Sequence, residues 1–256
     1  MGGNFPKTPF FPTVSPHPPL RFKKTPRHLP PTSGEKSNLS RVSSLTRSAT
    51  KTKILATALE LFNNEGEAQV SSVDIASVMG ISPGNLYYHY KGKDEIIAAL
   101  FEDFDAEIRQ VLSAPLKDPL AIEDNWIYLY IIFEEIFDFR FFYRNQGELL
   151  QRIPDLRGPF SRILALKERA GFSLLSTLED LEKLTFDEGE KAALAGRLAQ
   201  HFTFWLQYHD LRFGTAPEKR LIDQGVFMTL IQITPYWEGG EGYAELLSEF
   251  ASGKME

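Results

Sequence analysis

The segment at residues 71–93, SSVDIASVMGISPGNLYYHYKGK, constrains the fold more than any other part of the chain. It contains two helix starts. Ser71 is followed three residues later by an aspartate, the spacing of a capping box, and Ser82 precedes Pro83, a residue favoured at the first helical position. Gly80 lies between them, where a helix commonly ends in a left-handed residue. The segment therefore predicts two short helices joined by a tight turn, the plan of a helix-turn-helix.

The second short helix, from Pro83 to about His89, has an inward and an outward side. Leu86 and Tyr90, four residues apart, can pack inward. Small, polar and aromatic side chains remain for the outward side. Any small helical hairpin could carry the same caps, so the two helices alone leave DNA binding and a purely structural hairpin equally open.

The stretch from about Arg47 to Ile97 resembles the DNA-binding domain of TetR-family transcriptional regulators. Its most specific part is the run G-I-S-x-G-x-L-Y-x-H-Y-K-x-K-x-E, where many spaced positions agree at once. Tyr90 stands where the family more often has Phe, and Ser72 where Thr is common. The rest of the chain resembles the family only in length and helical character. The matching residues are Ile54, Ala58, Leu61, Phe62, Gly66, Ile75, Ala76, Gly80, Ile81, Ser82, Gly84, Leu86, Tyr87, His89, Tyr90, Lys91, Lys93, Glu95 and Ile97.

A DNA-contacting surface is expected around the second short helix. In a helix-turn-helix protein the recognition helix reads base edges, while flanking cations and helix N-termini hold phosphates. The resemblance implies phosphate contacts for Tyr87, Tyr88, His89 and Lys93, and the two serines at the start of the first short helix can donate to phosphate. For each lysine, a solvated face is the alternative. The candidate DNA-binding residues are Lys51, Ser71, Ser72, Ser82, Pro83, Gly84, Asn85, Tyr87, Tyr88, His89, Lys91 and Lys93.

The charge distribution fits this interpretation although the chain has a net charge of −6. Residues 1–46 carry seven Lys and Arg against a single acid, and they hold nine of the sixteen prolines. We expect them to form a disordered, proline-rich basic arm. Further along, basic residues bracket the proposed DNA helices within an otherwise acidic body, which suits a protein that docks one surface on DNA.

Several other classes of protein are disfavoured. The chain has no cysteine, which excludes disulfides, Cys-ligated zinc and thiol catalysis. No apolar run reaches membrane-spanning length, and the N-terminus lacks the apolar core of a signal peptide. We therefore expect a cytoplasmic protein. No phosphate loop, nucleophile elbow or H-E-x-x-H occurs, so no cofactor, metal or enzymatic activity is expected.

The expected fold is all-α, with an N-terminal three-helix DNA-binding domain and a larger all-helical C-terminal domain for ligand binding and dimerisation. No alternating strand pattern of useful length occurs. The expected divisions are the arm at 1–46, the DNA-binding domain with its linking helix at 47–113, and the regulatory domain at 114–256, with Pro115 and Pro119 breaking the chain near the second boundary. The expected helices span about 45–64, 71–79, 83–89, 93–113, 119–143, 148–153, 154–184, 187–213 and 217–236.

The regulatory domain is rich in aromatic residues that could line a ligand pocket, although aromatic stripes at helical spacing are more often plain core. His201 and His209, eight residues apart, could seat a metal, but hydrogen-bonded core groups are the stronger expectation. The candidate pocket residues are Trp126, Tyr130, Phe133, Phe137, Phe142, Phe172, His201, Phe202, Trp205 and Tyr208.

Dimerisation is expected because one helix-turn-helix module buries little area and because dimers of such modules read half-sites about 34–36 Å apart. The expected interface is formed by the helices at about 187–213 and 217–236, where Gly225 and Thr229 could permit close helix approach. The alternative is that these helices only close the core of the monomer.

The resulting hypothesis is a sequence-specific, DNA-binding transcriptional regulator. The resemblance implies a ligand-responsive repressor that binds a palindromic operator as a homodimer and responds to an unidentified small-molecule effector. An activator or dual regulator, a helical enzyme and a structural helical protein remain as alternatives.

Overall fold

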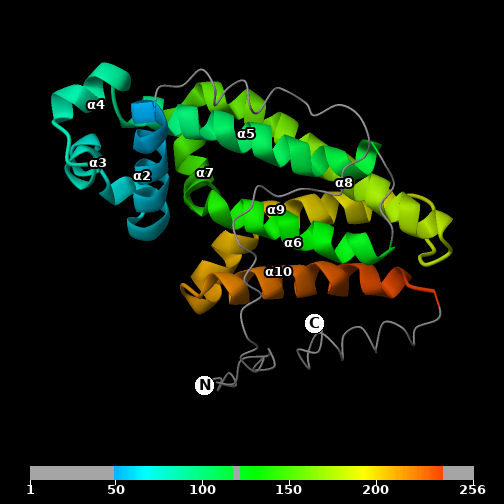
Figure 1. Cartoon of the computed structure of the whole chain (residues 1–256). Helices are drawn as coiled ribbons and strands as arrows, with labels where there is room; N and C mark the ends of the chain where they lie inside the picture. Colours follow the sequence, from blue (N-terminus) through cyan, green and yellow to red (C-terminus); the bar gives the residue numbers. More distant parts are fainter. Residues whose placement is uncertain (1–48, 118–121, 239–256) are drawn as a thin grey trace, which may run out of the picture. The chain divides into compact units, whose positions relative to one another are not determined.

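The computed structural model describes residues 49–117 and 122–238, with side chains for 49–115 and 127–238. The expected basic arm at 1–46 and the side chain of Trp126 lie outside these residues. The described elements are helices, with no β-strand among them (Figure 1), so the all-α prediction is confirmed. The helices are α2 (Ala49–Glu65), η1 (Glu67–Gln69), α3 (Ser72–Val78), α4 (Pro83–His89), α5 (Lys93–Lys117), α6 (Ile122–Asp138), α7 (Arg140–Arg152), η2 (Pro154–Leu156), α8 (Arg157–Asp180), α9 (Glu190–Phe213), α10 (Glu218–Ile233) and η3 (Thr234–Tyr236).

The head, α2 to α4, forms where the local sequence signals place it. Ser71 and Asp74 form a reciprocal capping box at the start of α3. Gly80 has a φ of 66°, a left-handed conformation that favours glycine. Ser82 caps α4 by accepting a hydrogen bond from the Asn85 backbone N–H at 3.2 Å, and proline occupies the first turn. Both expected helix starts are confirmed.

The core of the head is formed by one face of each helix. Ile54 and Phe62 of α2 are buried together with Ile75 of α3 and Leu86 of α4. These contacts fix the angle of the two short helices, which are too short to be stable alone. Val73 is half exposed, and Ile75 and Ala76 supply the inward face of α3.

The body consists of α5 to α10. Helix α8 packs against both α5 and α9, and α10 covers α6 and α9 (Figure 1). A buried cluster of aromatic rings joins α5 to the start of α7, with ring-centroid separations of 5.0–5.9 Å between Phe101, Phe104, Phe139, Phe142 and Tyr143. Aromatic pairs of this kind contribute stabilisation beyond the area that they bury.

Several helix boundaries differ from expectation. The separate helix expected at about 148–153 is the end of α7, and the helix expected from 154 is preceded by the 3-10 turn η2 and begins at Arg157. Helix α5 continues through Pro115 to Lys117 instead of ending at Ser113, because its long contact with α8 outweighs the lost backbone hydrogen bond. Ser173 of α8 donates a hydrogen bond to the Pro115 carbonyl at 2.9 Å. The single helix expected at about 119–143 is two helices, α6 and α7, broken at Phe139 with φ −110° and ψ 33°.

Candidate functional site

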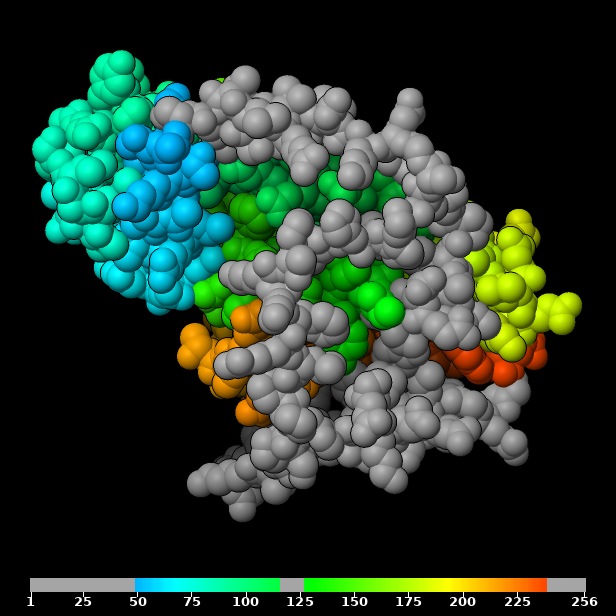
Figure 2. Space-filling view, in the orientation of Figure 1, coloured from blue at the N-terminus to red at the C-terminus, as the bar shows by residue number. Residues whose placement is uncertain are grey.

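Helix α4 presents its polar and aromatic residues on the outer surface of the head. Pro83, Gly84 and Asn85 at its N-terminus are exposed, as are Tyr87 and Tyr88, and the Tyr88 side chain is 81% exposed. The surface of α3 and α4 is open in the space-filling view (Figure 2). A large exposed aromatic side chain on a short helix with a polar N-terminus can insert into or lie along a DNA groove.

The remaining candidate residues around α4 are placed differently. His89 is half buried, with its ring edge-on to Tyr88 at 5.2 Å. The Ser71 hydroxyl donates to Asp74 Oδ2 at 2.6 Å, and hydrogen bonds from the Ser71 side chain and backbone lower the pKa of Asp74. Ser72 is buried, so its side chain does not reach the outer surface. The side chains of both serines are therefore occupied or buried within the head, and neither is free to donate to a phosphate.

The three candidate lysines also differ. Lys91 is exposed at the end of α4. The Lys51 ammonium lies 5.3 Å from the centre of the Tyr90 ring. The Lys93 ammonium donates to the Glu67 carbonyl at 3.0 Å and pairs with the Glu67 carboxylate at 2.9 Å. Lys91 is therefore the candidate lysine most available for a phosphate, while Lys93 is held within the protein.

Glu67 is the main residue of the head that the sequence did not reveal. It lies in η1, between α2 and α3, and is fully buried. Besides Lys93 it binds Arg152, at the end of α7, with Nη2 2.6 Å from Oε1. Arg152 Nε in turn donates to Asp94 at 3.0 Å. We call these four residues the Glu67 network; it ties the head to the body through one buried carboxylate.

A second junction ties the end of α2 to the start of α7. The Asn63 side chain accepts from the Phe141 backbone N–H at 3.0 Å and donates to the Asp138 carbonyl at 2.8 Å. Arg140 donates to the Asn64 side chain at 2.9 Å. The break at Phe139 frees these backbone groups from helical pairing, so the unforeseen break between α6 and α7 is where the head attaches.

The candidate pocket residues separate into a cluster and several outliers. Phe133, His201, Phe202 and Trp205 lie together beneath α10, with ring centroids 5.3–5.8 Å apart for Phe133–His201, Phe133–Phe202 and His201–Trp205. The Trp205 indole donates to the Leu221 carbonyl at 3.2 Å. These rings pack on one another and on α10, so they form a solid core between α6, α9 and α10.

The outliers lie elsewhere on the body. The Tyr130 hydroxyl donates to Asp223 at 3.2 Å, Phe137 stacks with Arg140, and Phe142 belongs to the aromatic cluster with α5. Phe172 and Tyr208 are exposed on the surface of α8 and α9. The candidate aromatic residues therefore do not share one pocket.

The two histidines are hydrogen-bonded groups beneath α10, as expected. His201 Nε2 lies 3.1 Å from the Gly225 carbonyl, and His209 Nε2 lies 3.0 Å from the Gln224 side-chain oxygen. Burial lowers the pKa of both rings, which favours their neutral forms. Within the described residues no group of three or more His, Cys, Asp or Glu is arranged to hold a metal ion.

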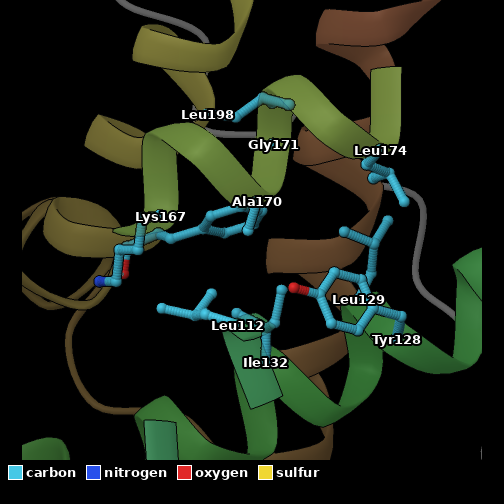
Figure 3. A pocket seen from close by; sticks show the side chains of 10 residues that line it. Leu112, Tyr128, Leu129, Ile132, Lys167, Ala170, Gly171, Leu174 and Leu198 are labelled. Atoms are coloured by element: carbon cyan, nitrogen blue, oxygen red, sulfur yellow. The ribbon is translucent and has the colours of Figure 1, made fainter. Parts of the chain in front are cut away.

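An enclosed cavity of about 10 Å³ lies inside the body, among α5, α6, α8 and α9 (Figure 3). Of the candidate pocket residues whose side chains the structure describes, only Phe202 lines it. Its two polar lining side chains are Tyr128 and Lys167, and the other lining side chains are apolar or small. Sequence reasoning missed both polar residues, because neither stands out within an amphipathic helix.

Comparison with known proteins assigns the chain to a family. A family model described as "Bacterial regulatory proteins, tetR family" matches residues 54–100, and one described as "Bacterial transcriptional repressor" matches residues 103–242. The second match alone spans more than half of the chain. The chain belongs to the TetR family. This assignment confirms the resemblance inferred from the residues around α4.

Individual relatives of this TetR-family chain agree. It is 31% identical over 77 residues to the HTH-type transcriptional regulator AcrR of Shigella flexneri, covering 28% of this chain and 36% of AcrR. It is 30% identical over 81 residues to the HTH-type transcriptional repressor KstR2 of Rhodococcus jostii (strain RHA1), covering 30% and 40% respectively. The matches thus span less than half the length of these curated relatives.

The fold match to a solved TetR-family structure is more extensive. The crystal structure of a TetR-family transcriptional regulator from Marinobacter aquaeolei VT8 superposes with a TM-score of 0.71 and 28% identity, covering 79% of this chain and 99% of that one. The expected combination of a helix-turn-helix head and a larger helical body is therefore confirmed. Among the described residues, no helix has the length and apolarity needed to cross a bilayer.

Proposed function

We propose that this TetR-family chain is a repressor that binds a palindromic operator as a homodimer and is released by a small-molecule effector. The observation that carries the DNA-binding part is the division of α4 into two sides. Leu86 and Tyr90 anchor the helix in the head, while Asn85, Tyr87 and Tyr88 stay exposed on a rigid, capped turn. Such rigidity is required of a helix that reads base edges.

The residues on and around α4 would contact different parts of the DNA. The N-terminus of the helix, at Ser82, Pro83, Gly84 and Asn85, enters the major groove, where Gly84 allows close backbone approach. Tyr87, Tyr88 and His89 contact the groove edge and phosphates, and Lys91 flanks them with an exposed positive charge. Lys51 and Lys93 contribute less, since both are partly buried and Lys93 pairs with Glu67. Phosphate contacts position the head, and base contacts supply the specificity.

The proposed homodimer forms through α9 and α10. Phe204, Tyr208 and Leu211 of α9 follow one another at helical spacing and are exposed, Leu211 to 90%, and Ile231 of α10 is exposed as well. Contiguous exposed apolar side chains on a helical face are typical of an interface. Gly225 does not serve this interface, since it is buried against Phe133 within the subunit.

A gel-shift experiment with DNA from the promoter region of the protein's own gene tests the proposal. Wild type should bind this duplex more tightly than random duplex, and Tyr88→Ala should weaken specific binding about tenfold, the loss of one good contact. Phe172→Ala is the matched control, because it removes another exposed aromatic side chain from α8, away from α4. Failure of wild type to bind any duplex in dilute salt would overturn DNA binding.

The dimer and repression are tested separately. Leu211→Asp should convert a dimer to a monomer in sedimentation experiments and weaken operator binding, because a monomer engages one half-site. A wild-type protein that is monomeric at micromolar concentration contradicts the dimer. Transcription in vitro from the bound promoter should fall as protein is added; a rise would identify an activator instead.

A further inference from the structure

Lys167, on α8, is a buried amine that pairs with no carboxylate in the part of the chain that the structure describes. Its side chain is essentially inaccessible to solvent. Its ammonium donates to the Thr203 hydroxyl at 3.1 Å and to the Phe202 carbonyl at 3.4 Å, and it lies 4.7 Å from the centre of the Tyr143 ring. Among the described residues no carboxylate forms an ion pair with it. Buried charges are normally paired, so this arrangement calls for a counter-ion.

The surroundings of Lys167 disfavour its charged form. Glu135 of α6 is also buried and contributes, after burial itself, to raising the pKa of the Tyr143 hydroxyl. Burial alone lowers the pKa of Lys167 to about 7. The protein therefore holds a strong hydrogen-bond donor where its charged form is disfavoured, and an anion placed beside it would restore that form.

Tyr128, on α6, is the second polar group of the same cavity. Its hydroxyl is buried, and no atom in residues 49–115 or 127–238 forms a hydrogen bond with it. Figure 3 shows this hydroxyl directed toward Leu112 and Ile132, two residues that line the same cavity. Burial raises the pKa of Tyr128, so the phenol stays protonated and can donate. An unpaired buried hydroxyl is uncommon in native proteins and points to a missing acceptor.

The shape of the lining indicates an elongated ligand. Lys167 and Leu174 lie seven positions apart on α8, which corresponds to about 10 Å along the helix. Figure 3 places Lys167 at one end of the lining and Leu174 at the other. Between them Ala170 and Gly171 leave space, and leucines face them from the other helices. The present volume of about 10 Å³ holds one water molecule at most, so a ligand enters by displacing side chains.

We propose that this cavity opens to bind a small molecule with an apolar body and a carboxylate, whose carboxylate pairs with Lys167. A second oxygen on the molecule would accept the hydrogen bond of Tyr128. A charged Lys167 ammonium can only donate, and the Tyr128 phenol can donate as well, which favours a ligand that carries an anionic acceptor over a cationic amine. The inference rests on the proposed function, because it identifies the chemical class of the effector.

Calorimetric titration of the full chain with three probes of equal apolar length tests the inference. Octanoate supplies the carboxylate, octan-1-ol the same body without charge, and octylamine the opposite charge. Wild type should bind octanoate at least tenfold more tightly than octan-1-ol, and octylamine most weakly. Equal binding of octanoate and octan-1-ol, or no octanoate binding up to its solubility limit, would overturn the proposal. This comparison needs no variant and does not depend on one folding.

A variant then assigns the anion to its site. Lys167→Met keeps the length of the side chain and removes the charge, so octanoate affinity should fall at least tenfold while octan-1-ol affinity is retained. The matched control is Lys191→Met, which removes a lysine of α9 that pairs with Glu179 and lies 5.0 Å from the centre of the Phe172 ring, outside the cavity lining. Unchanged octanoate affinity in Lys167→Met would assign the anion elsewhere and overturn the site.

Failure of the effector proposal can be distinguished from failure of the DNA-binding proposal. Gel shifts on the same preparations report DNA binding without any probe. A protein that binds its promoter but does not prefer octanoate refutes the effector class alone. A protein that prefers octanoate but binds no duplex refutes the DNA-binding proposal and leaves the cavity's specificity established.

Discussion

Replacement of Arg152 by methionine should loosen the head from the body. Arg152 Nη2 lies 2.6 Å from the carboxylate of Glu67, which is fully buried, and only Lys93 remains to pair with that carboxylate in the variant. A hydrogen bond to a charged group contributes about 1.5–3 kcal/mol. Breaking a fully buried pair costs about 3–5 kcal/mol, but the Arg152 side chain is 31% exposed, so solvent offsets part of the loss.

We therefore expect Arg152→Met to lower the free energy of unfolding by about 2 kcal/mol, measured from urea midpoints. Arg109→Met is the control, because Arg109 is similarly exposed and pairs through Nε with Asp105 at 2.8 Å, but that pair lies on the surface of one helix. Its loss should cost less than about 0.5 kcal/mol. The difference between the two variants isolates the effect of burying Glu67.

A double-mutant cycle with Glu67→Gln measures the pairing itself. The coupling energy between Arg152→Met and Glu67→Gln should be about 1–2 kcal/mol, within the range for residues in one ion-pair network. Equal losses for Arg152→Met and Arg109→Met, or a coupling energy near zero, would show that the buried carboxylate does not hold the head in place.

Three further outcomes are expected. Lys91→Ala should weaken binding to specific and random duplexes alike and flatten the slope of log affinity against log salt by about 0.9, measured by gel shift; an unchanged slope contradicts a phosphate contact. Gly225→Ala should destabilise the fold by about 1–3 kcal/mol in urea, because an added Cβ would lie 2.4 Å from Phe133, whereas Gly196→Ala, which meets nothing within 4 Å, should be neutral or stabilising. The pKa of Lys167 is about 7 in the folded chain, against an ordinary value of 10.5, so the unfolded chain binds more protons between pH 7 and pH 10.5. The free energy of unfolding should therefore rise by about 2 kcal/mol from about pH 7 to pH 9 in wild type but not in Lys167→Met, measured from urea midpoints at each pH.

The parts of the fold that sequence predicted are those governed by local signals. The capping box at Ser71, the proline of α4 and the left-handed Gly80 each depend on residues within one turn. These are also the features that define the head, which explains why the helix-turn-helix was located correctly. Leu86 and Tyr90 were placed in the core correctly by their spacing alone.

The parts that sequence did not predict depend on contacts between distant residues. Glu67 and Arg152 are 85 positions apart, and nothing near either residue marks the pair. The break at Phe139 falls between Asp138 and Arg140 in an aromatic-rich stretch whose apolar residues continue on both sides, so helical periodicity gives no reason to stop there. The sequence also could not separate the aromatic residues of the core from those that line the cavity. All of them are aromatic side chains at helical spacing, and they differ only in which distant helix packs against them.

Helix α7 contacts both the head and the surroundings of the cavity, which yields one further prediction. Tyr143 near its start lies beside the Lys167 ammonium, and Arg152 at its end binds Glu67. Between them the helix is kinked at Asn145, with φ −122° and ψ 19°, so the two halves of α7 already differ in direction at this residue. A ligand carboxylate that pulls the Lys167 ammonium away from the Tyr143 ring would therefore disturb the start of α7, and the end of the same helix binds the head through Arg152 and Glu67.

The coupling is measurable because binding effects between two sites are reciprocal. Saturating octanoate should weaken promoter binding in gel shifts, and promoter DNA should weaken octanoate binding in calorimetry by the same factor. In Arg152→Met, octanoate should change promoter affinity less, and promoter DNA should change octanoate affinity less, so both coupling factors approach one. The octanoate affinity of the DNA-free protein should stay unchanged, since Arg152 does not line the cavity. Arg109→Met should preserve them. Coupling factors that survive Arg152→Met would place the connection outside the Glu67 network, through α2 and the Asn63 contacts or through the dimer.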